Sequence, residues 1–540
     1  MGSHRTFLRL ARGLALGGLV ATLGCGETSR NHAAAPAGAA NAEGGTAGDV
    51  SAMGGAAAAA GDTQVGPCVF QDPEVAELVR FQILQADKLD GAVDGSVGIE
   101  AITSLDVSQD VGALGGIECL KNLEELRLTV YGGDAPSVEL APLSGLSRLR
   151  NLWLNGPFLL NGSFGNLALE NLELVGLALD DLAEVGAEHG IRGLWLTDVP
   201  ITSLHGIESL DQLSQLHVEN AKLTSLEPLA AISGLEELSL QEMSDLTSLT
   251  GLEPHTRLRQ VGIDDIPLQS LGPLAGAAQL EALHVQRAAL TSLAGLEKKP
   301  RLTTVTVAMS SVEDVTGLGD SPALTYLTLT ENHIADLSPL AGCPALTTLN
   351  VNSNALTSLA ALASLDALGS LDAGLNALGA IDVELPASLV ELALDHNAIT
   401  SIEPLAQRAI TTLNISDNPL ESLAPLWELP ALRSLGAEGV GATTLEAFPL
   451  AQLSSLDAGH NLIKDVAPLD GLQNLSVNVS DNVIVSLPAD FVGSGAACDG
   501  LILFGNPLDL AAHQRLTWLC ENGTGTYRWD GGMCDKCPRL

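Results

Sequence analysis

Six residues that could bind a ligand recur at one place in a periodic leucine pattern. Each lies one residue after the first leucine of a Leu-x-Leu triplet: Arg127, Trp153, Glu173, Trp195, His217 and His284. Exposed indoles attract cations through their π faces, and tryptophan is frequent at binding hot spots. A carboxylate between two indoles therefore favours a cationic or amphipathic partner. Alternatively, the rings lie flat on neighbouring aliphatic side chains, or irregular coils around 126–152 turn them elsewhere.

The sequence contains no pattern that indicates catalysis or a cofactor. The HExxH and GxSxG motifs, the P-loop and a GxGxxG after a strand are all absent, and the 11 histidines are scattered. We therefore expect a non-enzymatic protein with no cofactor and no catalytic metal. The formal net charge of −40 also argues against nucleic acid as a partner, since phosphate binding needs clustered lysine and arginine. Cationic proteins are electrostatically easier partners, although the acidity also suits a merely solvated surface.

The spacing of the six residues follows from a repeat that runs through most of the chain. The unit reads LxxLxLxxNxIxxLxPLAxLPx, and most repeats are 21–23 residues long. Successive side chains of a strand point to opposite faces, so the two leucines of the triplet face a core. Later apolar residues, such as Ile334, Leu337 and Leu340, are expected to fill the same core. The triplets begin at residues 105, 126, 152, 172, 194, 216, 238, 261, 283, 305, 327, 349, 371, 392, 413, 435, 456, 477 and 501.

This unit is identified as a leucine-rich repeat, and it resembles the 22-residue class found in bacterial internalins. The resemblance covers roughly residues 68–507 and implies an α/β solenoid, an arc or horseshoe with a parallel β-sheet on its concave face. The segment CVFQDPEVAELVRFQI, from residue 68, resembles the helical N-terminal cap of such proteins.

The consensus asparagine divides the repeats into two halves. Its amide is expected to bond to backbone groups of adjacent coils where the chain leaves the strand. It is present at 332, 354, 376, 397, 418, 461, 482 and 506. Earlier coils carry Leu177, Val199, Ala221, Met243, Ile266, Ala288 and Ser310 at that place. We therefore expect the first half to curve or pack differently.

The cysteines indicate disulfides at both ends of the repeats. Cys119 lies in a column otherwise held by glycine and serine, off the core and facing the cap that Cys68 opens, so we expect a Cys68–Cys119 bridge. Cys343 lies in a leucine column and is expected to be a buried free thiol. The C-terminal set, Cys498, Cys520, Cys534 and Cys537, matches either two disulfides or a zinc site. Export favours disulfides; their pairing stays open, and the short loop disfavours a bridge between the last two.

The N-terminus predicts export and a lipid anchor. Arg5, Arg9 and Arg12 precede an uncharged run that is too short to span a bilayer, as in a signal peptide. The stretch ATLGC resembles the bacterial lipobox, with Cys25 as the lipidated residue and Thr22 where leucine is usual; ordinary cleavage elsewhere is the alternative. The expected division is a signal peptide at 1–24, a flexible Ala/Gly-rich tether at 25–67, an N-terminal cap at 68–104, repeats at 105–507 and a cysteine-containing cap at 508–540.

These features predict a lipid-anchored protein of the bacterial cell envelope, on the outer membrane or cell surface, that binds a protein on its concave face. The alternative is a structural or adhesive envelope component that binds cell-wall glycan or another surface polymer. Aromatic residues concentrated on a few coils indicate a specific binder, and they occur in the first half. Uniform small polar residues indicate a spacer, and they prevail in the second half. The sequence does not indicate an oligomeric state.

Overall fold

The computed structural model describes most of the chain from residue 64 onward, and its described part forms one compact unit. The predicted signal peptide, Cys25, most of the tether, Cys498, Cys537 and the side chain of Cys534 lie outside the described residues. The described residues are 64–65, 68–89, 98–107, 113–130, 137–138, 141–156, 159–160, 167–183, 185, 190–472, 475–489, 491, 500–522, 526–530 and 532–534.

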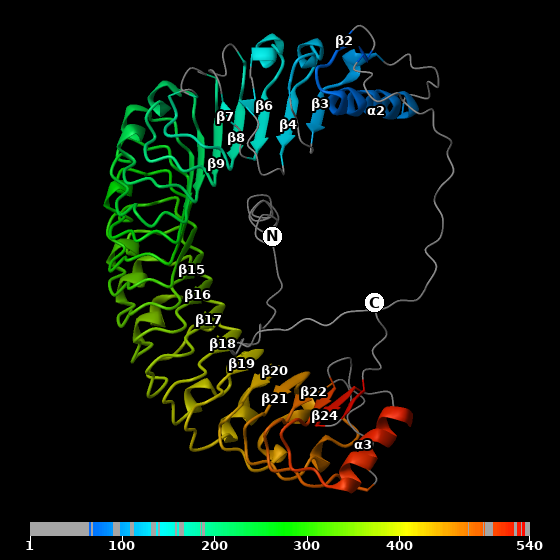
Figure 1. The fold of residues 1–540 in the computed structure, drawn as a ribbon. Helices are drawn as coiled ribbons and strands as arrows, with labels where there is room; N and C mark the ends of the chain where they lie inside the picture. The colour runs from blue at the N-terminus through cyan, green and yellow to red at the C-terminus, as the bar shows by residue number, and fades with distance from the viewer. Residues whose placement is uncertain are drawn as a thin grey trace, which may run out of the picture. The chain divides into compact units, whose positions relative to one another are not determined.

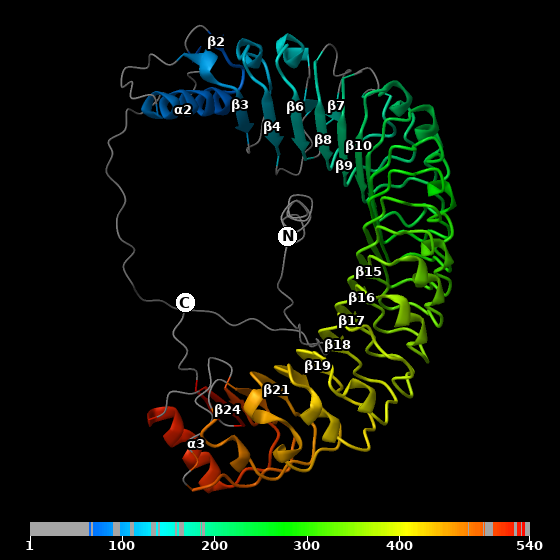
Figure 2. The same cartoon turned by 180° about the vertical axis from the view of Figure 1, so that it is seen from behind.

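Each repeat contributes one strand to a long parallel sheet that lines the inner face of an arc (Figure 1). Figure 2 shows the same succession of coils from behind, with the short helical turns on the outer side. The strands pair in chain order from β3 (Ser104–Val107) to β24, and β25 adds an antiparallel edge. Two short strands, β5 (Ser137–Val138) and β7 (Leu159–Leu160), pair with each other separately.

After the four-residue β3, the strands of the first half are five residues long, and those of later coils are three residues long except for the two-residue β23. The longer strands are β4 (Glu125–Thr129), β6 (Asn151–Asn155), β8 (Asn171–Val175), β9 (Gly193–Thr197), β10 (Gln215–Glu219), β11 (Glu237–Gln241), β12 (Gln260–Asp264), β13 (Ala282–Gln286) and β14 (Thr304–Ala308). The shorter ones are β15 (Tyr326–Thr328), β16 (Thr348–Asn350), β17 (Ser370–Asp372), β18 (Glu391–Ala393), β19 (Thr412–Asn414), β20 (Ser434–Gly436), β21 (Ser455–Asp457) and β22 (Ser476–Asn478), followed by β23 (Leu501–Ile502).

Most coils return along the outer side through a short 3₁₀ helix. Several begin with proline in the first turn, where its missing N–H costs nothing. Their bounds are η1 (Ile99–Ala101), η2 (Ile117–Cys119), η3 (Ala141–Gly145), η4 (Ile207–Ser209), η5 (Glu227–Ala231), η6 (Gly272–Leu274), η7 (Thr316–Leu318), η8 (Ser338–Gly342), η9 (Ala360–Ser364), η10 (Glu403–Leu405), η11 (Ala424–Glu428), η12 (Leu445–Ala447), η13 (Leu450–Gln452) and η14 (Ala467–Leu469).

The repeat register expected from the sequence is confirmed. Leu327 pairs with Leu349, and Leu349 pairs with Leu371, so that equivalent leucines stack from coil to coil. The same pairing joins the triplets from Leu105 to Leu501. Strand residues alternate between buried and partly exposed, because the triplet leucines face the core and their neighbours face the concave side. Ile334, Leu337 and Leu340 close this core from the outer side and are at most 2% exposed.

An asparagine ladder runs through most coils of the second half. Asn418 donates to the carbonyl oxygens of Leu394, Ile415 and Ser416, and its Oδ1 accepts from the N–H of Ile399. All eight consensus asparagines make equivalent bonds to the preceding coil. Strands with this asparagine are three residues long or shorter, and so is β20, whose coil has Val440 at the same place. The first half, without the ladder, keeps five-residue strands.

Caps cover both ends of the repeats, as the sequence predicted. Helix α2 (Pro73–Leu89) follows a short hairpin of β1 (Gln64–Val65) and β2 (Cys68–Val69). Cys68 and Cys119 form the expected disulfide, with their Cα atoms 6.0 Å apart. At the other end lie helix α3 (Leu510–Asn522), β24 (Tyr527–Trp529) and β25 (Gly532–Cys534). Cys520 is disulfide-bonded, and Cys343 is buried and free.

Candidate functional site

The structure places all six sequence-predicted residues on the concave face and brings five of them together. Arg127, Trp153 and Glu173 are register partners on β4, β6 and β8. Trp195 on β9 and His217 on β10 continue the same row. We call these five residues the concave row. His284 lies on β13, separated from His217 by the small residues of β11 and β12.

Trp195 lies against its own strand and keeps part of its ring exposed on the concave face. A Cβ atom at Gly193 would clash with the indole of Trp195 and with Oδ1 of Asn171. The indole therefore occupies the space above Gly193, which only glycine leaves open. Asn171 also donates from Nδ2 to Asn151 Oδ1 at 2.6 Å, so fixed amide groups border the ring. The ring is partly buried but outside the core.

Trp153 already carries a cation from within the chain. The guanidinium carbon of Arg127 lies 4.4 Å from the centroid of the Trp153 ring, which is a cation–π contact. An arginine on the neighbouring strand thus covers Trp153. Of the two indoles, Trp195 is the one without a cation over it in the described structure.

Charged groups next to Trp195 give this part of the face an acidic border. Glu173 is its register partner on β8, and Glu219 lies at the end of β10. His217 Nε2 lies 3.4 Å from Glu219 Oε2, which fixes the orientation of the imidazole. Farther along, burial lowers the pKa of His284, and the nearby Asp264 and Arg287 act in opposite directions on it. A neutral His284 therefore adds hydrogen-bonding capacity but no positive charge near pH 7.

The concave face changes its chemistry in the second half. The same row holds Asn350, Asp372, Asn414, Asp457 and Asn478, and each side-chain oxygen accepts a hydrogen bond from the backbone N–H two residues later. These polar groups thus stabilise their own chain. Burial raises the pKa of Asp372, and the neighbouring Asp395 raises it further.

Sequence reasoning missed a set of buried polar side chains on the outer side of the core. His255, Lys299 and Ser321 occupy the column of Cys343, which the sequence marks as apolar, and they are at most 1% exposed. Lys299 Nζ donates to the carbonyl oxygen of Ala275 at 2.8 Å, and His255 Nε2 contacts that of Leu229 at 3.0 Å. Burial lowers the pKa of both side chains. The residue types alone contained this signal, because polar residues interrupted a leucine column.

Two histidines at the carboxyl edge of the sheet were also missed. His396 lies 3.1 Å from Asp395 and 3.1 Å from Asp417, and His460 lies 3.4 Å from Glu438 and 3.2 Å from Asp481. Exposed pairs of this kind contribute little to stability. Within the described ranges, no three His, Cys, Asp or Glu side chains are grouped to hold a metal ion. No helix in that part of the chain is long and apolar enough to cross a bilayer.

Comparisons with known proteins agree with this architecture. A family model described as leucine-rich repeats (2 copies) matches residues 322–364. No curated protein sequence matches the chain. A chain of the Toll–Spatzle complex from Drosophila is similar, with a TM-score of 0.55 and 16% identity over 79% of this chain and 59% of that chain. The chain has the fold of a leucine-rich-repeat solenoid.

Two bacterial structures are also similar. One is the functional domain of InlJ from Listeria monocytogenes, with 17% identity over 77% of this chain and 82% of that chain, and a TM-score of 0.47. The other is a leucine-rich-repeat protein of Leptospira interrogans, with 18% identity over 82% of this chain and 96% of that chain, and a TM-score of 0.40. At these identities the likenesses concern the fold alone.

Proposed function

We propose that this protein is a non-enzymatic binding module of the bacterial cell envelope and that it recognises a protein partner on the concave row. The observation that carries this proposal is Trp195, a partly exposed indole held over Gly193 with Glu173 and His217 on the adjacent strands. Tryptophan in such a setting provides a large contact area at low entropic cost. Leucine-rich-repeat proteins typically act as interaction modules, which agrees with this function.

The partner chemistry follows from the charges around the ring. Glu173 and Glu219 border Trp195, and the whole chain has a formal net charge of −40. A partner with a cationic or amphipathic side chain is therefore electrostatically favoured, as part of a protein surface. The same charge disfavours nucleic acid.

The proposal places the protein at the envelope, exported and held by acyl chains on Cys25. Its supports are the basic and uncharged runs of residues 1–24, the lipobox-like ATLGC and the presence of disulfides, which form in oxidising compartments. A multi-chain lipid would give stable attachment without a membrane-spanning helix. Incorporation of labelled palmitate that is lost in Cys25→Ser tests the anchor, and membrane attachment without any label would contradict it.

A structural or adhesive role, with binding to cell-wall glycan, is the second candidate. Its supporting observation is the second half of the concave face, where small polar residues prevail and their side chains bond to the backbone. A protein that acts mainly as a spacer would not depend on Trp195.

Affinity capture tests the proposed binding surface. The full chain in a non-ionic detergent is immobilised and exposed to envelope extract, and the affinity of each captured protein is then measured after purification. Trp195→Ala should cost about 1–2 kcal/mol, or roughly 5–30-fold in Kd. Gly193→Ala should weaken binding as well, because its methyl group displaces the indole.

The matched control is Asn350→Ala, which changes the equivalent strand position in the second half of the repeats. It should leave the affinity for the partner nearly unchanged. The circular dichroism spectrum of each variant checks its fold. A partner that binds Trp195→Ala as tightly as the parent protein would refute the concave-row proposal.

A further inference from the structure

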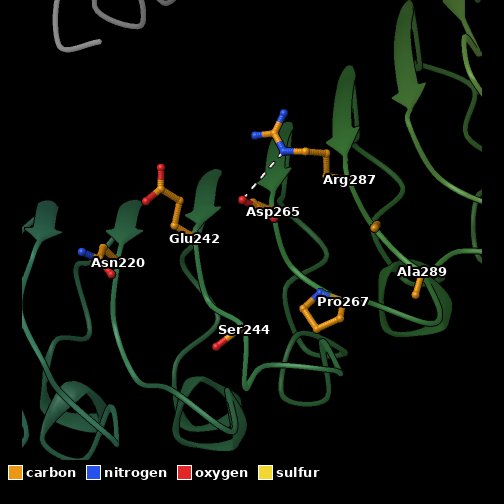
Figure 3. A pocket seen from close by; sticks show the side chains of 8 residues that line it. Asn220, Glu242, Ser244, Asp265, Pro267, Arg287 and Ala289 are labelled. Atoms are coloured by element: carbon orange, nitrogen blue, oxygen red, sulfur yellow. Dashed lines mark ion pairs between the residues drawn. The ribbon is translucent and has the colours of Figure 1, made fainter. Parts of the chain in front are cut away.

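A groove runs along the carboxyl edge of strands β8 to β13, beside the concave face. It consists of two adjoining hollows of about 330 and 570 Å³ that share Asn220. Its wall is a row of side chains that each follow the end of a strand: Asp198, Asn220, Glu242, Asp265 and Arg287. Figure 3 shows the last four of them. We call this feature the corner groove. Its wall residues have left-handed backbone, with φ between 50° and 57°, so the row repeats once per coil.

The floor of the corner groove consists mainly of small or rigid residues. Ala178, Pro200, Ser244, Pro267 and Ala289 line it, with Lys222 as the single long side chain among the floor residues. Figure 3 shows Ser244, Pro267 and Ala289 in a row of their own below the charged side chains. A floor of this kind allows the main chain of a ligand to approach closely. Five strand spacings of about 4.8 Å give a length of roughly 24 Å, which fits about seven residues of extended peptide.

The wall of the corner groove offers acceptors of hydrogen bonds. In the described part of the chain, the carbonyl oxygens of Asp198, Asn220, Glu242 and Asp265 accept no hydrogen bond. In the next coils the equivalent oxygens are occupied, because Glu331 O accepts from Ser310 N and Ser353 O from Asn332 N, both at 3.2 Å. Farther along, those of His396, Asp417, His460 and Asp481 again accept no hydrogen bond within the described chain. The carboxylates of the wall add further acceptors. Arginine and lysine side chains are donors only, so they complement such a wall.

The centre of the corner groove carries more negative than positive charge. Arg287 Nη2 lies 2.8 Å from Asp264 Oδ1, without hydrogen-bond alignment, and its Nε lies 3.8 Å from Asp265 Oδ2. One guanidinium thus faces two carboxylates, whereas Glu242, exposed between Asn220 and Asp265, has no ion pair within the described residues. The excess negative charge lies around Glu242.

We propose that the corner groove binds an extended, arginine- or lysine-rich segment of a partner protein. The peptide backbone lies over the small floor residues, and a cationic side chain reaches Glu242 and Asp265. The chain's own segment 26–63 is a poor occupant, because Arg30 is its only arginine or lysine and it contains Glu27, Glu43, Asp49 and Asp62. The proposal concerns a second surface and is independent of Trp195.

The test measures binding of a defined basic peptide to the full chain in non-ionic detergent. The probe is a fluorescein-labelled (Gly-Arg)4 peptide with a benzophenone at its centre, and the readouts are fluorescence anisotropy and the positions of photo-cross-links. Glu242→Lys should weaken binding at least about fivefold, and Glu242→Gln should weaken it less. Cross-links should fall within residues 176–289.

Glu331→Lys is the matched control, because Glu331 is an exposed residue at the same place in its repeat, with φ of 54°, outside the groove lining. It makes the same charge change and should reduce binding less than about twofold. Trp195→Ala should leave binding of this peptide unchanged. This expectation does not depend on whether the concave row binds a partner. Equal losses in the two lysine variants would overturn the inference, since they would mean general attraction to an acidic protein. Cross-links on the concave row, on the outer side or on a second copy of the chain would overturn it as well.

Discussion

Replacing Asn418 by alanine should loosen the coils around it strongly, since this side chain bonds to two coils. It is 3% exposed, donates to Leu394 O at 2.8 Å and accepts from Ile399 N at 3.0 Å. Alanine leaves at least these two buried backbone groups without a partner. An unsatisfied buried group costs roughly 1–3 kcal/mol, so we expect a loss of about 3–5 kcal/mol, including the bonds to Ile415 O and Ser416 O.

The assay has to be local, because a solenoid need not unfold in one step. Hydrogen exchange followed by mass spectrometry should show amides of residues 390–420 exchanging about 10²–10⁴ times faster, at 1.4 kcal/mol per factor of ten. Amides of residues 194–241 should keep their rates. Asn122→Ala is the control, since its single surface bond to Glu100 O should be worth about 1 kcal/mol or less. A loss below about 1 kcal/mol for Asn418→Ala would refute the claim that the ladder holds the coils together.

Two further predictions concern the polar column of the core. Burial raises the pKa of Cys343 to about 11. Iodoacetamide at pH 8 should therefore leave this thiol unmodified in the folded protein and modify it fully in urea. Rapid modification of the folded protein would contradict the burial of Cys343. Burial lowers the pKa of Lys299, so the folded state binds fewer protons than the unfolded state between the two pKa values, and stability gains with rising pH in that window. Urea unfolding of the parent protein and Lys299→Met from pH 7 to 10.5 should therefore show the parent improving relative to the variant, and parallel curves would disprove a lowered pKa.

The repeat architecture was predictable from the sequence because it rests on one-dimensional spacing. Leu327, Leu349 and Leu371 are spaced one coil apart, and stacking one coil on the next makes such residues neighbours in space. The Cys68–Cys119 bridge followed from similar reasoning, since a cysteine in a column of glycine and serine lies off the core. Placement of the concave row on adjacent strands followed directly from the register.

Details that depend on pairs of side chains were not predictable in this way. The register made Arg127 a neighbour of Trp153, but its position over the ring depends on the rotamers of both side chains. The fit of Trp195 above Gly193 depends on a missing Cβ atom two residues earlier on the same strand. Lys299 was overlooked because an apolar column predicts apolar residues, whereas the backbone carbonyl of Ala275 accepts its ammonium group.

The substitution of the consensus asparagine connects the fold to both proposed surfaces. Where the asparagine is present, strands are short, and side chains such as Asn350 and Asp372 bond to their own backbone. Where Val199, Ala221 and Met243 replace it, the strands keep five residues and the corner carbonyls of those coils stay unbonded within the described chain. On the concave face, side chains that bond to their own backbone in the second half thus give way in the first half to the concave row. The half without the ladder gives up inter-coil hydrogen bonds, and it is the half that holds Trp195 and the corner groove.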